Sequence, residues 1–109
     1  MKRGEVWTVS GGAGFAGKPR PAVIVQSDAF AETNSVVICM FTSDSTSAPT
    51  VRLVVKPTSE NGLRNASHLM VDKVTTVARS RIGKRVGLLE KEAMEAIDAM
   101  LIVFLGLAD

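Results

Sequence analysis

Gly17-Lys18-Pro19-Arg20-Pro21-Ala22-Val23-Ile24-Val25-Gln26 is the stretch around which the rest of the chain is organised. Its first half is basic and contains two prolines, and its second half, from Ala22, is an apolar strand. Each proline fixes its own φ and favours an extended backbone at the preceding residue, so Lys18 and Arg20 are expected to be extended. An arginine held at the mouth of a strand suits phosphate binding. Alternatively, Arg20 is only a solvated charge at a strand end, and this stretch alone does not decide between the two interpretations.

Length and composition indicate one soluble globular domain, covering residues 1–109. The hydrophobic fraction of 46% and the charged fraction of 22% are ordinary for such a domain. No apolar segment follows Lys2 and Arg3, so a secretion signal is not expected. The longest apolar run, 99–108, has about half the length of a membrane-spanning helix. The sequence therefore predicts a cytoplasmic protein that does not associate with membranes.

Cys39 and His68 are the only cysteine and the only histidine. A single residue of each kind cannot build the usual zinc sites, and a ribonuclease site with two histidines is excluded. Cys39 lies within an apolar run and is expected to be a small buried hydrophobe. Gly12–Lys18 has the Gly-x-x-x-x-Gly-Lys spacing of nucleotide-binding loops, but Pro19 follows where that motif has Ser or Thr, and a strand follows instead of a helix. We therefore expect neither a metal ion nor a cofactor.

The formal charge of +2 conceals an uneven distribution. Residues 1–88 hold 12 of the 13 Lys and Arg residues and six of the 11 Asp and Glu residues, a net charge of +6. Residues 89–109 hold one lysine and five acidic residues, a net charge of −4. A basic body with an acidic C-terminal segment indicates an anionic partner for the body.

Strand-forming segments occupy most of the chain before residue 78. They are Lys2–Val9, Ala22–Gln26, Val36–Phe41, Val51–Val55 and Ser67–Val74, the last extended or bent through Val77. A glycine-rich loop, Ser10–Gly17, joins the first two strands, and one helical turn is expected in Ser27–Asn34. Alternation in the last strand predicts His68, Met70 and Asp72 on one face. The basic segment Arg79–Val86 is expected to be a connection to the C-terminal region.

The period of the apolar residues changes from two to 3.6 between Glu90 and Leu107, which predicts an amphipathic helix. Its apolar stripe is expected to consist of Ala93, Ile97, Met100, Leu101 and Phe104. Several strands followed by one terminal helix are typical of an α+β or small-barrel class.

Four segments together resemble the MazF/PemK toxins, the ribonucleases of toxin–antitoxin pairs. Lys2-Arg3-Gly4-Glu5-Val6-Trp7 resembles the family's opening, and Arg20-Pro21-Ala22-Val23-Ile24-Val25 after a glycine-rich loop resembles its Arg-Pro strand. Val37-Ile38-Cys39-Met40-Phe41-Thr42-Ser43 resembles the strand that ends in the catalytic threonine, and Asp72-Lys73-Val74-Thr75-Thr76-Val77 resembles a segment near the fifth strand. The resemblance implies a small SH3-like half-open antiparallel β-barrel with a C-terminal α-helix, the fold shared by CcdB and MazF.

The resemblance also implies the site residues. The family's catalytic arginine and threonine map onto Arg20 and Thr42, and its acidic residue maps onto Asp72. Lys73 stands where many members have a glutamine that contacts RNA. The substrate-binding residues implied in this way are Gly17, Lys18, Ser43, Asp72 and Lys73.

The implied activity is sequence-specific, metal-independent cleavage of single-stranded mRNA through attack by the RNA's own 2′-hydroxyl, leaving 2′,3′-cyclic phosphate and 5′-hydroxyl ends. Such a reaction needs positioning and charge stabilisation at phosphorus, which Arg20 and Thr42 can provide. The general base stays open: His68 has a suitable ordinary pKa, yet its place in a strand also fits a structural histidine. The implied partners are a second copy of the chain and an antitoxin whose acidic tail folds on binding. Two rival functions remain, a CcdB-like gyrase poison and a non-catalytic SH3-like binding module.

Overall fold

Seven strands, three short 3₁₀ turns and one α-helix make up the part of the chain that the computed structural model describes, residues 1–11, 18–43 and 51–108. In chain order they are β1 (Glu5–Val9), β2 (Arg20–Ile24), η2 (Asp28–Phe30), β3 (Ser35–Thr42), β4 (Arg52–Val55), β5 (Ser67–Met70), η3 (Val71–Lys73), β6 (Thr75–Ala78), η4 (Arg79–Arg81), β7 (Ile82–Leu88) and α1 (Lys91–Phe104). The first four predicted strands are confirmed with shifted ends, and η2 is the helical turn expected in the second connection.

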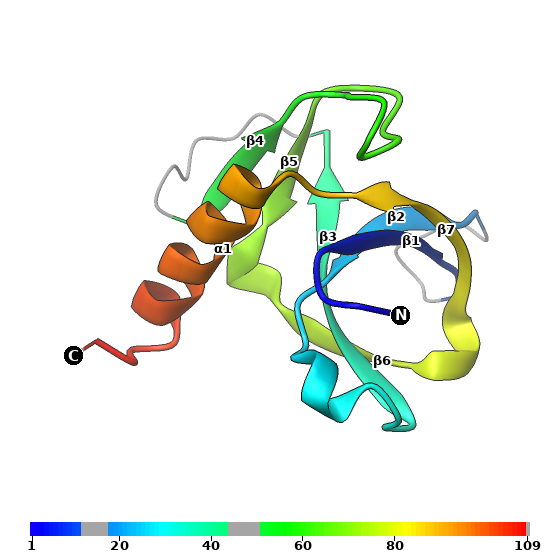
Figure 1. Ribbon diagram of the computed structural model, residues 1–109, viewed down its shortest axis with the longest axis horizontal. Helices are drawn as coiled ribbons and strands as arrows, with labels where there is room; N and C mark the ends of the chain where they lie inside the picture. The colour runs from blue at the N-terminus through cyan, green and yellow to red at the C-terminus, as the bar shows by residue number, and fades with distance from the viewer. Residues whose placement is uncertain (12–17, 44–50, 109) are drawn as a thin grey trace.

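The long strand β3 is the centre of the sheet. It pairs with β2 along one edge and with β5 and β6 along the other, and every pairing is antiparallel. The strand order is β4-β5-β3-β2-β1-β7, with β6 also on β3. Within the described residues β6 and β7 do not pair, so the sheet curves into a barrel that is open on that side (Figure 1). This arrangement confirms the predicted α+β fold with a half-open antiparallel barrel.

Both faces of β2 and β3 are buried, which explains their nearly continuous apolar sequences. Val23, Cys39 and Leu69 belong to a cluster that extends from the sheet to Ile97 of α1. A second cluster lies on the other face of these strands and packs against Trp7 and Met1. Its buried members are Val9, Ala22, Ile24, Val36, Ile38, Met40 and Val77. Figure 1 shows the N-terminal segment inside the ring of strands, where this second cluster lies.

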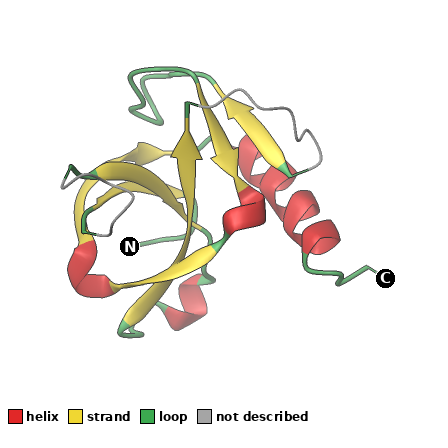
Figure 2. Ribbon diagram, turned by 180° about the vertical axis from the view of Figure 1, so that it is seen from behind, coloured by secondary structure: helices red, strands yellow, loops and turns green. Residues whose placement is uncertain are grey.

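The predicted fifth strand is wrong in its second half, because η3 divides it into β5 and β6. Phe41 pairs with Leu69, so an unbroken register would place residue 72 opposite Ile38; Ile38 pairs with Thr75 instead. The turn η3 therefore adds three residues, and Figure 2 shows it as a short helical segment beside α1. Val71 within this turn is fully buried in the cluster that contacts α1. Asp72 consequently does not share a strand face with His68.

The predicted basic connection at 79–86 is also wrong, because η4 and β7 occupy it. β7 pairs with β1, which adds a strand to the sheet. Its glycines allow close approaches that a side chain would block: a Cβ on Gly87 would lie 2.3 Å from the Glu60 carbonyl oxygen. Two glycines and adjacent basic residues are poor strand formers, so tertiary pairing outweighs local propensity here.

The terminal helix α1 is confirmed, with shorter bounds than predicted. Gly106 has φ 72°, and its amide donates to the Val103 carbonyl, which ends the helix in the left-handed conformation that glycine favours. Ile97 is fully buried against the sheet, as expected, but Phe104 is 44% exposed. Phe104 lies in the last turn of the helix, which projects beyond the sheet (Figure 1). No helix in the described ranges is long and apolar enough to cross a membrane.

Candidate active site

The ends of β2 and β3 bring Arg20 and Thr42 to the same edge of the sheet. Arg20 is the first residue of β2, is exposed, and is paired with Val9 on β1. The β2–β3 ladder ends at the pair of Ala22 and Met40, and Arg20 and Thr42 each lie two residues beyond that pair, Thr42 as the last residue of β3. Two residues that are 22 positions apart in sequence thus lie at the same edge of the sheet.

A pocket of about 620 Å³ opens at this edge, and Arg20, Thr42 and Ser43 all line it. The ends of the first three strands form one wall and residues 62–67 form another, and Val86 of β7 also lines the pocket. Its other lining residues are Thr8, Pro19, Pro21, Phe41, Gly62, Leu63, Arg64, Asn65, Ala66 and Ser67. Hydroxyl groups and guanidinium groups thus line a cavity large enough for part of an RNA chain.

The wall formed by residues 62–67 stands on a rigid base. Asn61 is fully buried, and its Oδ1 accepts hydrogen bonds from the amides of Thr58 and Leu63, both at 3.0 Å. Its Nδ2 donates to the Lys56 carbonyl and to Oε1 of Glu90, just before α1. Every polar group of this side chain is engaged, so the turn keeps one conformation against the helix and β7.

Close packing fixes the same turn from its other side. Gly62 has φ 69°, and a Cβ there would lie 2.2 Å from the Val86 carbonyl oxygen. Only glycine combines that backbone conformation with that approach. The sequence shows Asn61-Gly62 as a turn, but it does not show that this turn presents Arg64 and Asn65 to the pocket. These two residues are the site members that sequence reasoning missed, together with Thr8 and Ser67.

The remaining predicted site residues lie in three places. Lys18 is exposed just before Pro19, which lines the pocket, while Gly17 lies outside the described residues. Asp72 and Lys73 lie in η3 and do not line the pocket. The structure therefore brings Arg20, Thr42 and Ser43 together and places Asp72 and Lys73 elsewhere on the surface.

Asp72 is held by an arginine of β4. Oδ1 accepts from Nε of Arg52 at 2.7 Å, and Oδ2 accepts from its second terminal nitrogen at 3.2 Å. These hydrogen bonds, which outweigh partial burial, lower the pKa of Asp72. The carboxylate is consequently ionised and engaged at neutral pH, which suits recognition of a donor group better than proton transfer.

His68 is half-buried on β5 and is not among the lining residues; its neighbour Ser67 lines the pocket instead. Successive side chains of a strand point to opposite faces, so the pocket side of β5 belongs to Ser67. Cys39 is fully buried, and burial raises the pKa of its thiol to about 12. This confirms Cys39 as a buried hydrophobe. In the described ranges no group of three His, Cys, Asp or Glu side chains could hold a metal ion.

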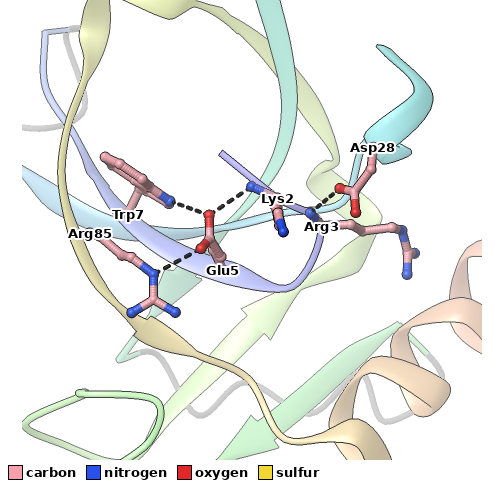
Figure 3. A network of polar contacts seen from close by, with 6 residues as sticks. All are labelled: Lys2, Arg3, Glu5, Trp7, Asp28 and Arg85. Atoms are coloured by element: carbon pink, nitrogen blue, oxygen red, sulfur yellow. Dashed lines mark hydrogen bonds and ion pairs between the residues drawn. The ribbon is translucent and has the colours of Figure 1, made fainter. Parts of the chain in front are cut away.

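A polar network joins β1, β7 and the N-terminal segment (Figure 3). Oε1 of Glu5 accepts from the Lys2 amide at 2.7 Å and from Nε1 of Trp7 at 3.1 Å, and Oε2 accepts from Nε of Arg85 at 2.8 Å. Burial alone would raise the pKa of Glu5, but these donors outweigh it and bring the pKa to about 2. Arg85 is thus engaged in an ion pair, and the arginines that line the pocket are Arg20 and Arg64.

Known proteins with the same sequence pattern and fold are toxins. The family described as PemK-like, MazF-like toxin of type II toxin–antitoxin system matches residues 2–105. A probable endoribonuclease MazF of Mycolicibacterium smegmatis is 45% identical over 108 residues, which is 99% of each chain. An endoribonuclease in complex with its cognate antitoxin from Mycobacterial species superposes with a TM-score of 0.81 at 25% identity, covering 98% of this chain and 96% of that one.

MazF (Form-I) from Deinococcus radiodurans has the same fold, with a TM-score of 0.77 at 18% identity. That match covers 97% of this chain and 96% of the Deinococcus chain. The family match also covers nearly every residue of this chain, including Arg20 and Thr42 at the pocket. The protein therefore belongs to the PemK-like, MazF-like toxins of type II toxin–antitoxin systems.

Proposed function

We propose that this MazF-like endoribonuclease toxin cleaves single-stranded mRNA at the Arg20–Thr42 pocket, in a sequence-specific manner and without a metal ion. The RNA 2′-oxygen forms a bond to phosphorus while the bond from phosphorus to the 5′-oxygen breaks. The 2′-hydroxyl proton leaves, and the departing 5′-oxygen gains one. The products are a 2′,3′-cyclic phosphate and a 5′-hydroxyl. One observation supports the proposal above all: Arg20 and Thr42 line the same pocket.

Arg20 would stabilise the charge that develops on the phosphorane. Its guanidinium can donate two parallel hydrogen bonds to the non-bridging oxygens, which a point charge cannot do. Pro19 and Pro21 limit the backbone on both sides of it, so the group is positioned before RNA arrives. The Thr42 hydroxyl would donate a further hydrogen bond to the same phosphate, and Ser43 would contact it or the adjacent sugar.

Arg64 would bind a second phosphate across the pocket. It lines the same pocket as Arg20, is exposed, and follows the turn that Asn61 fixes. Successive phosphates of a single strand could then engage Arg20 and Arg64 in turn. Lys18 and Gly17, which precede Pro19 in the chain, would contact the RNA where it leaves the pocket.

Asp72 and Lys73 would contact RNA beyond the pocket. The Asp72 carboxylate is ionised and can accept hydrogen bonds from base amino groups, and Lys73 is exposed beside it. Because neither residue lines the pocket, their effect would fall on sequence preference and affinity more than on the chemical step.

The apolar end of α1 supports a homodimer. Its exposed large apolar residues are Ile102, Val103, Phe104, Leu105 and Leu107. So many exposed large apolar side chains within six residues are unusual on a monomer. We propose that a second copy covers these side chains. Light scattering that found only monomers at micromolar concentration would contradict this.

An antitoxin would bind the basic body through an acidic, disordered segment that folds on binding. The mycobacterial endoribonuclease with a similar fold was solved with its cognate antitoxin. Since the proposed substrate is mRNA, the toxin would act in the cytoplasm. A cognate antitoxin that bound without inhibiting cleavage would contradict binding at the RNA surface.

Cleavage of a defined RNA by the purified protein tests the proposed function. A labelled single-stranded RNA is incubated with protein in EDTA and, separately, in magnesium, and mass spectrometry identifies the fragment ends. We expect equal cleavage in both buffers, with cyclic phosphate and 5′-hydroxyl ends. Cleavage that required magnesium and left 5′-phosphates would contradict the mechanism. Binding without cleavage would favour a non-catalytic module, and inhibition of gyrase would favour a CcdB-like poison.

A further inference from the structure

Two arginines of the short turn η4 donate to backbone carbonyls of two different segments that lie beside this turn. Arg81 donates from Nε to the Ser10 carbonyl at 2.6 Å and from a terminal nitrogen to the Gly11 carbonyl. Arg79 donates from Nε to the Thr33 carbonyl at 2.8 Å and from a terminal nitrogen to the Ala31 carbonyl at 2.5 Å. Their chemistry is the same, but the segments that they hold differ.

Arg81 and the end of β1 donate hydrogen bonds to each other. The Ser10 amide donates to the Arg81 carbonyl at 2.9 Å, and its hydroxyl donates to the same oxygen at 3.3 Å. Side chain and backbone of Arg81 therefore hold the two residues that follow β1. Charge-assisted bonds to two neighbouring carbonyls define both the position and the direction of the chain there.

This point is one residue away from the backbone that positions Arg20. Val9, the last residue of β1, pairs with Arg20 on β2 and with Ile82 on β7. The pair between Val9 and Arg20 is the last of the β1–β2 ladder. A terminal ladder pair frays unless the chain beyond it is held. The hydrogen bonds from Arg81 to Ser10 and Gly11 hold the chain just beyond this terminal pair.

We propose that Arg81 is a positioning residue for RNA cleavage: it holds the end of β1 so that Arg20 keeps its place at the mouth of the pocket. The inference rests on the proposed function, because it concerns the geometry of that same site. Arg81 is itself absent from the lining residues, so it acts through Ser10, Gly11 and Val9. Its loss should slow the chemical step while RNA binding is largely retained.

Arg79 provides a matched control. The residues that it holds, Ala31 and Thr33, lie in the connection before β3, whereas Thr42 lies at the opposite end of that strand. Removing Arg79 should therefore cost stability without moving the pocket. The comparison of Arg81→Ala with Arg79→Ala separates positioning from general support of the fold.

The experiment measures three quantities for the native protein, Arg81→Ala, Arg81→Lys and Arg79→Ala. They are the single-turnover cleavage rate at saturating protein, the Kd for an RNA made uncleavable by one 2′-deoxy substitution, and the thermal midpoint. We expect Arg81→Ala to lower the rate roughly tenfold to a hundredfold, the scale of a small misplacement of a catalytic group. Its Kd should stay within about threefold of the native value, a small change on this scale. Arg81→Lys can donate to one carbonyl but cannot hold both, so its cleavage rate should lie between those of Arg81→Ala and the native protein. Arg79→Ala should cleave at the native rate.

Several results would overturn the proposal. Native cleavage by Arg81→Ala would do so, as would equal rate losses in Arg81→Ala and Arg79→Ala. A Kd that weakened in parallel with the rate would make Arg81 an RNA contact instead. If Arg81→Ala did not fold, a native rate in Arg81→Lys would refute the role and a reduced rate with native Kd would support it. Absence of cleavage by the native protein would instead refute the proposed function, which keeps the two failures distinct.

Discussion

Glu5 connects three parts of the molecule through one carboxylate. Its donors come from the N-terminal segment, from β1 itself and from β7, so a single ionised group links the first strand to the last (Figure 3). Only 15% of its side chain is exposed. An ionised carboxylate in such a place is stable because each oxygen accepts hydrogen bonds, and neutralising it should weaken the β1–β7 edge.

Replacing Glu5 by glutamine should therefore change how stability depends on pH. The pKa of Glu5 is lowered from 4.5 to about 2, so its contribution is complete above pH 4.5 and is lost as the pH falls toward 2. We expect Glu5→Gln to lower the free energy of unfolding at pH 7 by about 1–3 kcal/mol and to flatten the loss between pH 4.5 and 2.

Urea denaturation at a series of pH values checks this prediction. The exposed Glu95 of α1 provides the control, since Glu95→Gln should follow the native curve. A Glu5→Gln variant with the native difference in stability between pH 7 and pH 3 would show that the network does not depend on the charge of Glu5.

At the scale of whole elements, β7 shows how tertiary contacts decide a strand. Gly87 lies against the backbone of the turn before Gly62: a Cβ on it would lie 2.3 Å from the Glu60 carbonyl oxygen and 2.4 Å from the Asn61 carbonyl carbon. At Gly83 a Cβ would meet Oγ1 of Thr8 at 2.6 Å, a side chain that can rotate. The backbone beside Gly87 therefore cannot make room for a side chain, whereas the Thr8 side chain beside Gly83 can rotate away.

Alanine substitutions at these positions should differ accordingly. Gly87→Ala must push apart two backbone segments, so we expect a loss of roughly 1–3 kcal/mol or more in stability. Because that turn carries the wall of the pocket, cleavage should fall as well. Gly83→Ala should cost less, about the value of the hydrogen bond from the Lys84 amide to Thr8, near 1 kcal/mol. Thermal denaturation and cleavage assays of both variants check this; equal effects would contradict the packing argument.

The difference between local sequence patterns and long-range contacts explains which parts of the structure could be predicted from the sequence. β2 and β3 could be predicted because strands buried on both faces have continuous apolar sequences, and α1 because its apolar period is regular. Arg20 and Thr42, which the family resemblance singled out, then line one pocket. The strand β7 and the turn η3 could not be predicted, because pairing with β1 and burial of Val71 are long-range effects. Arg64 was missed for a related reason, since only the packing of Asn61 and Gly62 directs it to the pocket.

The whole molecule combines a basic body with an acidic helix, and the pocket opens on the body. Arg20 and Arg64 line the pocket, whereas Glu92, Glu95 and Asp98 are exposed on α1. A single RNA strand would thus meet positive charge at the pocket and negative charge along the helix. Such an arrangement orients an anionic chain before close contact forms.

RNA affinity should therefore fall steeply with salt, with a slope of about −0.7 for each phosphate contact on a single strand. Arg64→Gln should reduce that slope by about 0.7, because it removes one contact. Lys91→Gln, on the acidic helix, should leave the slope unchanged. Fluorescence anisotropy with an uncleavable RNA across a salt series measures this. An unchanged slope in Arg64→Gln would exclude the proposed phosphate contact on that wall.

The most direct test of the central claim is single-turnover cleavage of a short RNA by Arg20→Lys, with circular dichroism as the control for folding. This variant keeps the positive charge but loses the planar group that can hold two phosphate oxygens. We predict a native spectrum and a cleavage rate lower by about a hundredfold or more, the scale for loss of one preorganised donor. Thr42→Ala should show a milder loss, and His68→Ala should cleave at the native rate. Native cleavage by Arg20→Lys together with an inactive His68→Ala would contradict the assignment and would place the reaction on β5.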